Sequence, residues 1–308
     1  MKSSKVVILL STYNGERYLA EQLNSLLDQT YRNITIKIRD DGSSDKTREI
    51  ALKYCASNNN IEFLEGENLG VVGSFFELLY SVEENFDFVA FCDQDDIWHK
   101  NKIEVAIQKL QCFKGQAPVM YCGRVRLVDQ CLGFLHNGAV PRRPLSLNNA
   151  LFQNIATGCT IVLNRQSIDL LVSKKPNLNN VLMHDRWIYM VISSLGNIIY
   201  DNEPYIDYRQ HEGNVVGSSK GFLLLFNRLK RFNKDGRNTL SRQAQEFLYL
   251  YENQLSYKQR KLIVELLDAV CSAGFFKRIY YSLKLPVYRQ SIVDNLFSKI
   301  MLILGIYK

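Results

Sequence analysis

Three carboxylates lie within four positions of one another, at Asp93, Asp95 and Asp96. They follow an apolar run, residues 86–92, that has the composition of a buried strand. Carboxylates this close repel one another, so the cluster favours a hard divalent cation whose shell is completed by phosphate oxygens. The spacing therefore predicts a metal and phosphate site, and an acidic turn or a helix N-cap is the alternative.

Three further polar loops also follow expected strands. They are residues 11–15 with the sequence STYNG, residues 40–45 with DDGSSD and residues 68–70 with NLG. The carboxyl ends of parallel strands meet at one edge of a sheet, where ligands bind. The sequence therefore predicts that four polar loops share one rim, although residues 41–45 could also form an ordinary turn with a helix cap.

Short apolar runs alternate with amphipathic stretches through the first 113 residues. The expected strands are 6–10, 34–38, 61–64 and 86–92, and the expected helices are 18–27, 46–56, 73–82 and 100–113. This alternation predicts an α/β fold, with a mostly parallel sheet covered by helices on both faces. Beyond residue 114 we expect mixed α/β structure, with strands near 119–126 and 160–163, and then a helical region from residue 217.

The charge of the chain is unevenly distributed. The formal net charge is +7, yet residues 217–308 contain 16 Lys and Arg against 6 Asp and Glu, which predicts that this region meets an anionic partner. Aromatic and apolar residues at helical spacing accompany the basic residues at 222–232 and 275–281, a pattern that favours an anionic membrane surface. Packing on the rest of the chain or on a second copy, as in a homo-oligomer, is the alternative. Nucleic acid is not expected, because no binding motif is present.

The cysteines and the apolar runs indicate the compartment. The seven cysteines are scattered, odd in number and without a CxxC spacing, which favours reduced thiols in a cytosol. No apolar run approaches the roughly 20 residues of a membrane-spanning helix. The N-terminus has the charge of a signal peptide but too short an apolar segment, so residues 6–10 are expected to form a buried strand. The sequence predicts a cytoplasmic protein that is peripheral to the inner face of the cell membrane.

Together these motifs resemble the family 2 inverting glycosyltransferases of GT-A fold. The matching segments are 11–15, 40–45, 93–98 (DQDDIW), 184–187 (HDRW) and 208–214 (YRQHEGN). The likeness is greatest to bacterial rhamnosyltransferases that build surface polysaccharides. It implies a GT-A catalytic domain over residues 1–216, with a Rossmann-like nucleotide-sugar half at about 1–115 and an acceptor half at about 116–216. A basic helical region, 217–308, would follow.

The resemblance implies roles for the carboxylate cluster. Asp95 matches the direct metal ligand, and Asp93 matches the carboxylate near the nucleotide ribose. His211 resembles a late histidine that reaches back to the metal or the diphosphate. Mg²⁺ or Mn²⁺ suits an oxygen-rich site that keeps positions open for phosphates. Asp96 is either a third member of this site or the cap of the following helix.

The resemblance also implies a binding site for the donor. Asp41 matches the carboxylate that accepts a hydrogen bond from the pyrimidine base, and Asp40 is the competing choice. The other implied donor contacts are Thr12, Tyr13 and Asn14, in the loop that covers the base, and Asn68 and Gly70, in the loop that closes over the donor.

Inversion by single displacement needs one general base to deprotonate the acceptor hydroxyl. The resemblance assigns this role to Asp185, at an expected helix start, and the alternative is that Asp185 caps that helix or pairs with Arg186. His184 and Trp187 are weaker candidates for acceptor contacts, and Trp98 is expected in the core.

The sequence therefore predicts a metal-dependent inverting glycosyltransferase. It would move L-rhamnose from dTDP-L-rhamnose onto a lipid-linked glycan during the synthesis of a bacterial surface polysaccharide. One alternative keeps the enzyme but changes the donor to a UDP-hexose or a UDP-N-acetylhexosamine. Another is a non-catalytic assembly subunit that binds a nucleotide-sugar without turnover.

Overall fold

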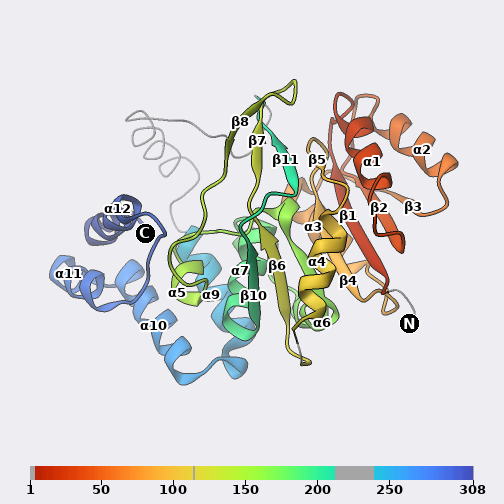
Figure 1. The fold of residues 1–308 in the computed structure, drawn as a ribbon. Coiled ribbons are helices and arrows are strands. Elements are labelled where there is room, and N and C mark those ends of the chain that lie inside the picture. The colour runs from red at the N-terminus through yellow and green to blue at the C-terminus, as the bar shows by residue number, and fades with distance from the viewer. Residues whose placement is uncertain (1–3, 114, 212–238, 308) are drawn as a thin grey trace. The chain divides into compact units, whose positions relative to one another are not determined.

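The computed structural model describes residues 4–113, 115–211 and 239–307 (Figure 1). The chain divides into two compact units, each assembled from separated stretches of sequence. The first unit consists of Met1–Val140, Ala156–Ser173 and Gly196–Gly217, and the second of Pro141–Ile155, Lys174–Leu195 and Ser218–Lys308.

A seven-stranded sheet forms the centre of the first unit, in the order β10-β6-β9-β4-β1-β2-β3. The pairs are parallel except for those of β9, which runs antiparallel to β4 and β6. The strands are β1 (Val6–Thr12), β2 (Ile34–Asp40), β3 (Ile61–Glu65), β4 (Phe88–Cys92), β6 (Val119–Gly123), β9 (Val162–Asn164) and β10 (Asn197–Asp201). The predicted α/β fold with a mostly parallel sheet is confirmed.

Helices cover both faces of this sheet, because its central strands are apolar on both sides. Val6, Ile8 and Leu10 of β1 are fully buried in a core that includes side chains of α1, α2 and α4. Val7 and Leu9 are equally buried and point to the opposite face, as alternation along a strand requires. The helices of this unit are α1 (Leu19–Leu27), α2 (Thr47–Ser57), α3 (Gly70–Tyr80), α4 (Lys102–Gln111) and α6 (Arg165–Val172).

A smaller sheet in the same unit has the order β5-β11-β7-β8. Its strands are β5 (Ile97–Trp98), β11 (Ile206–Arg209), β7 (Arg126–Val128) and β8 (Phe134–Asn137). The strand expected for 119–126 is therefore two strands, because the chain leaves the large sheet after Gly123 and joins the small one at Arg126. β5 pairs antiparallel with β11, with Trp98 opposite Ile206, so the end of β11 lies beside the carboxylate cluster.

The strand expected for 160–163 begins later, at Val162. A short 3-10 turn, η1 (Gly158–Thr160), precedes it and places Cys159 in the core of the first unit. Trp98 belongs to the same core, as expected, and is 2% exposed.

The second unit is helical. Its elements are α5 (Leu147–Ala150), η2 (Leu178–Asn180), α7 (His184–Leu195), α9 (Thr239–Tyr251), η3 (Glu252–Gln254), α10 (Tyr257–Cys271), α11 (Phe275–Lys284) and α12 (Ile292–Leu304). Its core contains Trp187 of α7, which packs on Phe247 and Tyr251 of α9 with ring centroids 6.2 and 6.4 Å away. α10 starts at a capping box of Ser256 and Gln259.

The helical character expected from residue 217 onward is observed from Thr239, and the apolar and basic stretch at 222–232 lies outside the described residues. Among the residues that the structure describes, none of the helices is both long and apolar enough to span a bilayer.

Candidate active site

The carboxyl ends of β1, β2, β3 and β4 lie at one edge of the large sheet. Thr12 at the end of β1 is in register with Asp40 of β2, and Asp40 is in register with Glu65 of β3. On the other side, Leu10 of β1 pairs with Cys92, the last residue of β4. The prediction that four polar loops share one rim is confirmed.

Gln94 joins the loop after β4 to the loop after β1. Its side-chain Oε1 accepts the N–H of Tyr13 at 2.8 Å, and its Nε2 donates to the carbonyl of Tyr13 at 3.0 Å. Gly15 makes room for this amide, since a Cβ there would lie 2.2 Å from Oε1. Tyr13, one of the predicted donor contacts, therefore has its backbone fixed while its side chain is 49% exposed.

The loops after β1 and β2 are also joined to each other. Asn14 adopts a positive φ of 46°, its N–H donates to Ser43 Oγ at 2.9 Å, and its Oδ1 accepts the N–H of Ser44 at 2.9 Å. Asp40 accepts hydrogen bonds from the hydroxyl of Thr12 at 3.0 Å and from the N–H of Ser43 at 3.0 Å. Asp40, the competing choice for the base contact, thus stabilises the conformation of this loop.

Asp41 connects the loop after β2 to the loop after β3. Its carboxylate is 2% exposed, pairs with the guanidinium of Arg39 and accepts the N–H of Leu69 at 2.9 Å. The next turn depends on Asn68, whose Oδ1 accepts the N–H of Gly70 at 3.1 Å, and on Gly70, whose φ is +71°. The predicted donor residues Asp41, Asn68 and Gly70 therefore belong to one connected loop.

Asp95 and His211 are 116 positions apart in the sequence and in direct contact in the structure. The distance from His211 Nε2 to Asp95 Oδ2 is 2.8 Å, and both side chains are partly buried. The imidazole also packs on the ring of Tyr18, with centroids 5.1 Å apart. The structure thus brings together the two residues that the sequence associates with a metal.

Asp96 is the most deeply buried member of the cluster, at 1% exposure. Its Oδ1 accepts the N–H of Arg209 at 3.1 Å, whereas its Oδ2 is enclosed without a hydrogen-bond partner among the described residues. Burial raises the pKa of Asp96 well above its usual range, and the charges of Asp95 and Asp93 raise it further. Asp96 does not cap α4, which begins after Asn101, so the helix-cap alternative is wrong.

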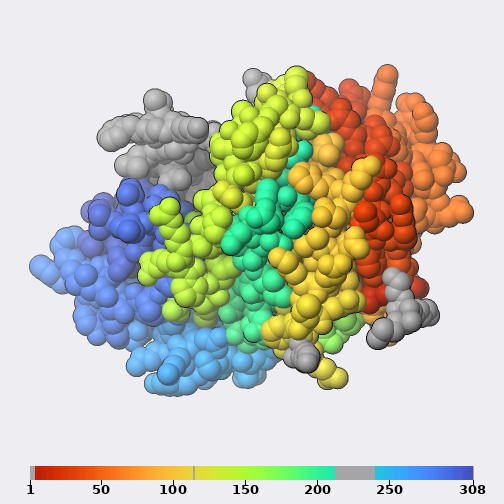
Figure 2. All heavy atoms as spheres, viewed as in Figure 1, coloured from red at the N-terminus to blue at the C-terminus, as the bar shows by residue number. Residues whose placement is uncertain are grey.

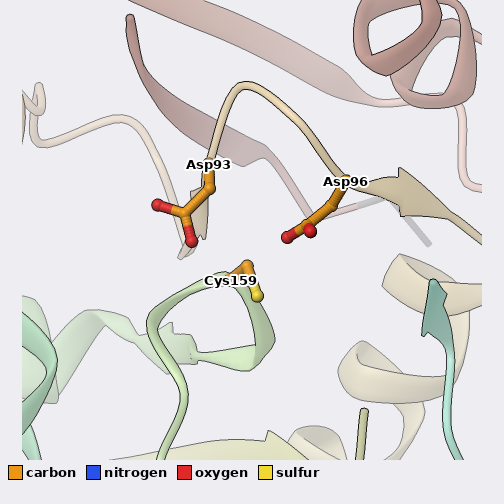
Figure 3. A group of neighbouring side chains, drawn as sticks. All are labelled: Asp93, Asp96 and Cys159. Atoms are coloured by element: carbon orange, nitrogen blue, oxygen red, sulfur yellow. The ribbon is translucent and has the colours of Figure 1, made fainter. Parts of the chain in front are cut away.

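Asp93, Asp96 and Cys159 converge on one point (Figure 3). One carboxylate oxygen from each aspartate and the sulfur of Cys159 all lie within 4.8 Å of one another. Burial raises the pKa of the Cys159 thiol well above its usual value. Nothing in the sequence pointed to Cys159, because it reaches the cluster through the η1 turn, far along the chain.

The donor atoms of this site fit a hard divalent cation. Asp93 and Asp96 offer carboxylate oxygens at one point, and the nearby contact of Asp95 with His211 offers a carboxylate oxygen and an imidazole nitrogen, which are ligands that Mn²⁺ and Mg²⁺ accept. The sulfur of Cys159 is a softer ligand and suits these ions less well. The enclosed Oδ2 of Asp96 supports this reading, since buried acceptors are nearly always satisfied by a donor or an ion.

Arg209 fixes the position of the segment that carries His211. Its Nε donates to the carbonyl of Asp95 at 2.9 Å, its Nη1 to the carbonyl of Gln130 at 2.7 Å and its Nη2 to Glu21 Oε2 at 2.5 Å. The guanidinium also lies 4.4 Å from the centroid of the Tyr18 ring. Its role was not predicted, because none of these partners is near it in the sequence.

Lys102 places a buried positive charge in the same region. The side chain is 2% exposed, and its Nζ has no hydrogen-bond partner among the described residues. The ammonium lies 3.3 Å from the centroid of the Trp98 ring. Burial lowers the pKa of Lys102 to about 8, against the attraction of Cys159, Cys92 and Asp96.

The remaining predicted residues lie in the second unit, at the start of α7. Asp185 is in the first turn, and its Oδ1 accepts the N–H of Arg186 at 2.6 Å. His184 is 3% exposed, and burial lowers its pKa to about 3, so the imidazole is neutral at physiological pH. Trp187 is fully buried among aromatic rings of α9.

Comparisons with known proteins agree with this arrangement. Residues 7–159 match the family model described as "Glycosyl transferase family 2". The chain is 28% identical to the dTDP-rhamnosyl transferase RfbG of Shigella flexneri, over 97% of this chain and 100% of that protein. It is 33% identical to the Escherichia coli UDP-Glc:alpha-D-GlcNAc-diphosphoundecaprenol beta-1,3-glucosyltransferase WfgD, over 52% of this chain and 60% of that protein.

The solved structures show the same fold. TarS of S. aureus in complex with UDP-GlcNAc aligns with a TM-score of 0.59 at 17% identity, over 97% of this chain and 81% of that chain. The parallel sheet, the rim of polar loops and the sequence match over residues 7–159 all lead to one conclusion: the chain belongs to glycosyl transferase family 2 and has the GT-A fold.

Proposed function

We propose that this glycosyltransferase moves L-rhamnose from dTDP-L-rhamnose onto a lipid-linked glycan, with inversion at the anomeric carbon and with the help of a divalent cation. The observation that carries the proposal is the contact between Asp95 and His211 at the rim where the β1 to β4 loops meet. The choice of donor is supported by the likeness to RfbG along the whole length of both chains.

The nucleotide half of the donor would bind in the loops that the structure shows tied together. In this proposal Asp41 accepts a hydrogen bond from the thymine base, and Asp93 contacts the ribose. Thr12, Tyr13 and Asn14 cover the base, and Asn68 and Gly70 close over the donor. The exposed side chain of Tyr13 on a fixed backbone is suited to stacking on a base.

Asp95 and His211 would hold Mg²⁺ or Mn²⁺, with Asp93 and Asp96 beside them. When bound, such an ion stabilises the negative charge that develops on the leaving diphosphate. Arg209 keeps the Asp95 backbone next to the end of β11, so it would act as a positioning residue for His211.

Asp185 would act as the general base. The acceptor hydroxyl oxygen forms a bond to the anomeric carbon as the bond to the nucleoside diphosphate breaks, and the proton passes to the carboxylate of Asp185. His184 and Trp187, predicted as weaker acceptor contacts, are buried beside Asp185, so they would hold the start of α7 in place rather than contact the acceptor.

Two helices of the second unit support a peripheral position on the inner face of the cell membrane. On α12, Ile292, Leu296, Ile300 and Leu304 recur at every fourth position and are all exposed. On α11, Phe276 is 84% exposed. These helices also carry basic residues, and they appear in blue on the molecular surface in Figure 2. Apolar and basic residues on exposed helices are typical of binding to anionic lipid surfaces.

A UDP-sugar donor is the second candidate. It is favoured by the names of two similar proteins, since WfgD is described as using UDP-Glc and TarS was solved with UDP-GlcNAc. A non-catalytic nucleotide-sugar-binding subunit would keep the donor site but show no turnover.

A panel of nucleotide-sugars separates these candidates. Donor hydrolysis and transfer to membrane-extracted lipid acceptors are measured with dTDP-L-rhamnose, UDP-glucose and UDP-N-acetylglucosamine, with and without EDTA. We expect turnover with dTDP-L-rhamnose that EDTA abolishes and Mn²⁺ restores. Turnover that EDTA does not change would contradict the assignment of a metal. Faster turnover with a UDP-sugar than with dTDP-L-rhamnose would contradict the assignment of the donor.

Asp185→Asn tests the base. We expect transfer to fall by about a hundredfold to ten-thousandfold, the usual contribution of a general base, while the affinity for the donor is unchanged. Asp294→Asn, which removes a carboxylate of α12 in the same unit, is the matched control. Unchanged transfer in Asp185→Asn would remove Asp185 from the mechanism.

A further inference from the structure

The hairpin of β7 and β8 carries three exposed apolar side chains at its turn. Leu132 is 37% exposed, Phe134 55% and Leu135 48%. The turn lies in the first unit and is drawn in yellow-green at the top of Figure 1. Exposed apolar side chains are ordinary one at a time, but a group of them marks a surface that contacts a partner or a membrane.

The backbone of Leu132 is strained at the same place. Its φ is +67°, in the left-handed region that glycine and asparagine adopt more readily than leucine. The turn itself is held by Asp129, whose Oδ1 accepts the N–H groups of Cys131 and Gly133, each at 2.8 Å. The fold therefore does not require a leucine here, and a strained residue with an exposed apolar side chain indicates a role in binding.

The turn is held beside the rim of the candidate active site. Phe134 is in register with Val128 of β7, and Val128 is in register with Arg209 of β11. Neighbouring strands lie about 4.8 Å apart, so the backbone of Phe134 is about 10 Å from that of Arg209. The guanidinium of Arg209 donates to the carbonyl of Gln130, in the turn, and to that of Asp95, in the carboxylate cluster.

The charges around the turn favour an anionic partner. Arg126 places its guanidinium 5.1 Å from the centroid of the Phe134 ring, and it also pairs with Asp207. Arg17, from the loop after β1, is exposed and donates a hydrogen bond to a side chain of the turn. Asp129 is the only acidic residue within 124–137, and its carboxylate is bound to the backbone of the turn. Basic groups beside apolar side chains suit the headgroups and acyl chains of an anionic bilayer.

The size of the apolar surface distinguishes a bilayer from a protein partner. Three side chains that are already partly buried can cover only roughly 250 Å² more. A stable contact with a protein, or with a second copy of this chain, needs roughly 800 Å² on each side. A bilayer has no such requirement, because each apolar side chain that enters it contributes separately.

We propose that the turn of the β7–β8 hairpin, residues 130–135, inserts into an anionic lipid bilayer. Leu132 and Phe134 enter the acyl region, and Arg17 and Arg126 face the lipid phosphates. This contact is separate from the proposed membrane surface on α11 and α12, because it belongs to the unit that carries the carboxylate cluster. The inference rests on the proposed function for its purpose, since a lipid-linked acceptor would then meet the rim at the bilayer surface.

Tryptophan fluorescence of the full chain tests the contact without donor or acceptor, so its outcome is independent of the activity assays. The two native tryptophans, Trp98 and Trp187, are 2% and 0% exposed, and the added indole of Phe134→Trp therefore reports on the turn. We expect vesicles that contain phosphatidylglycerol to shift its emission to the blue, and lipids brominated in their acyl chains to quench it.

Leu52→Trp, at an exposed apolar position of α2 in the same unit, is the matched control, and neither vesicle should change its emission. Emission of Phe134→Trp that brominated lipids leave unchanged overturns the proposal, even if the protein binds the vesicles through another surface. A blue shift that appears without vesicles and grows with protein concentration would assign the turn to a contact with a second copy, and would also overturn it.

Leu132→Gly separates lipid binding from folding. Glycine adopts the left-handed conformation without strain, so this variant should melt at the same temperature as the wild type or higher. Its affinity for the vesicles should nevertheless fall by about tenfold, the loss expected when one leucine is no longer buried. Leu52→Ala removes an exposed leucine outside the turn and should bind as the wild type does. Wild-type vesicle affinity in Leu132→Gly would overturn the proposal.

Discussion

At the scale of single residues, the buried charge of Lys102 lowers the stability of the first unit. A charged amine that is 2% exposed and has no hydrogen-bond partner among the described residues lowers stability, and the contact with the Trp98 ring offsets only part of that loss. Its charge acts on Asp96 and Cys159, which belong to the cluster at the rim. A buried charge that lowers the stability of the protein beside a candidate site is expected to have a role in that site, because perturbed ionisable groups cluster at functional sites.

Lys102→Met should therefore stabilise the protein at neutral pH. The pKa of Lys102 is about 8 when folded, against 10.5 for the ordinary amine, so the folded state bears a penalty below pH 8 that disappears as pH rises through 10.5. We expect the free energy of unfolding at pH 7 to rise by about 1–3 kcal/mol, and this gain to shrink between pH 8 and 10.5. Urea titrations at a series of pH values measure it.

The control is Lys100→Met, because Lys100 is exposed and pairs with Asp28 in a surface salt bridge. This variant should change stability by less than about 0.5 kcal/mol at every pH. A loss of stability in Lys102→Met at pH 7 would contradict the assignment of the buried charge as a penalty.

His211→Ala tests the contact with Asp95. Removing one imidazole from the donor set should raise the Mn²⁺ concentration for half-maximal turnover by about ten- to a hundredfold. His136→Ala in β8 removes an imidazole outside the site and should leave the metal dependence unchanged. Identical Mn²⁺ titrations for the two variants would exclude His211 as a ligand.

At the scale of elements, the turn between β3 and α3 depends on backbone conformation rather than on packing. Gly70 has a φ of +71°, and a Cβ at this position would meet no atom within 4 Å. The Gly70→Ala substitution therefore isolates the cost of the left-handed conformation, which is about 1 kcal/mol. Gly274→Ala also adds a Cβ in open space, but at a φ of −73°, so it adds no left-handed strain and bears only the small cost of alanine at the N-cap of α11.

Thermal unfolding of both variants measures these costs, and the affinity for nucleotide-sugar shows whether the loop serves the donor. We expect Gly70→Ala to weaken donor binding as well as stability, because Asn68 and Gly70 set the turn that would close over the donor. Equal melting temperatures for the two alanine variants would contradict the strain argument.

The elements were predictable from sequence where local pattern decides, and less so where distant contacts do. Strands β1 to β4 and their loops follow from apolar runs bounded by polar turns, and the motifs in these loops carried the family resemblance. The break between β6 and β7 was missed, because the chain passes there from the large sheet to the small sheet and the local sequence pattern does not mark this change. Arg209 and Cys159 were missed for the same reason, since each meets the cluster through contacts with residues that are far away in the sequence.

At the scale of the whole molecule, the proposed position at the membrane depends on the exposed apolar side chains of α11 and α12. Flotation with vesicles that contain phosphatidylglycerol should carry the full chain to the top of a gradient. Leu296→Asp should weaken this binding by about tenfold or more, since it removes one apolar side chain of the α12 stripe and adds a charge of the same sign as the lipid. Val264→Asp, at an exposed apolar position on α10, is the matched control and should float normally.

A full chain that stays at the bottom of the gradient, or a Leu296→Asp variant that floats as well as the control, would exclude these helices as the membrane surface. Raising the salt concentration distinguishes the two contributions, because it screens the attraction of basic residues to anionic lipid but not the burial of apolar side chains.

The double hydrogen bond between Gln94 and the Tyr13 backbone has a kinetic consequence. An amide in an exposed loop normally exchanges its hydrogen with solvent quickly. The Tyr13 amide can exchange only after its hydrogen bond to Gln94 breaks. Opening of the loop after β1 is thereby tied to movement of the loop that carries the carboxylates. In the proposed enzyme, the two loops would therefore open together when the donor nucleotide leaves.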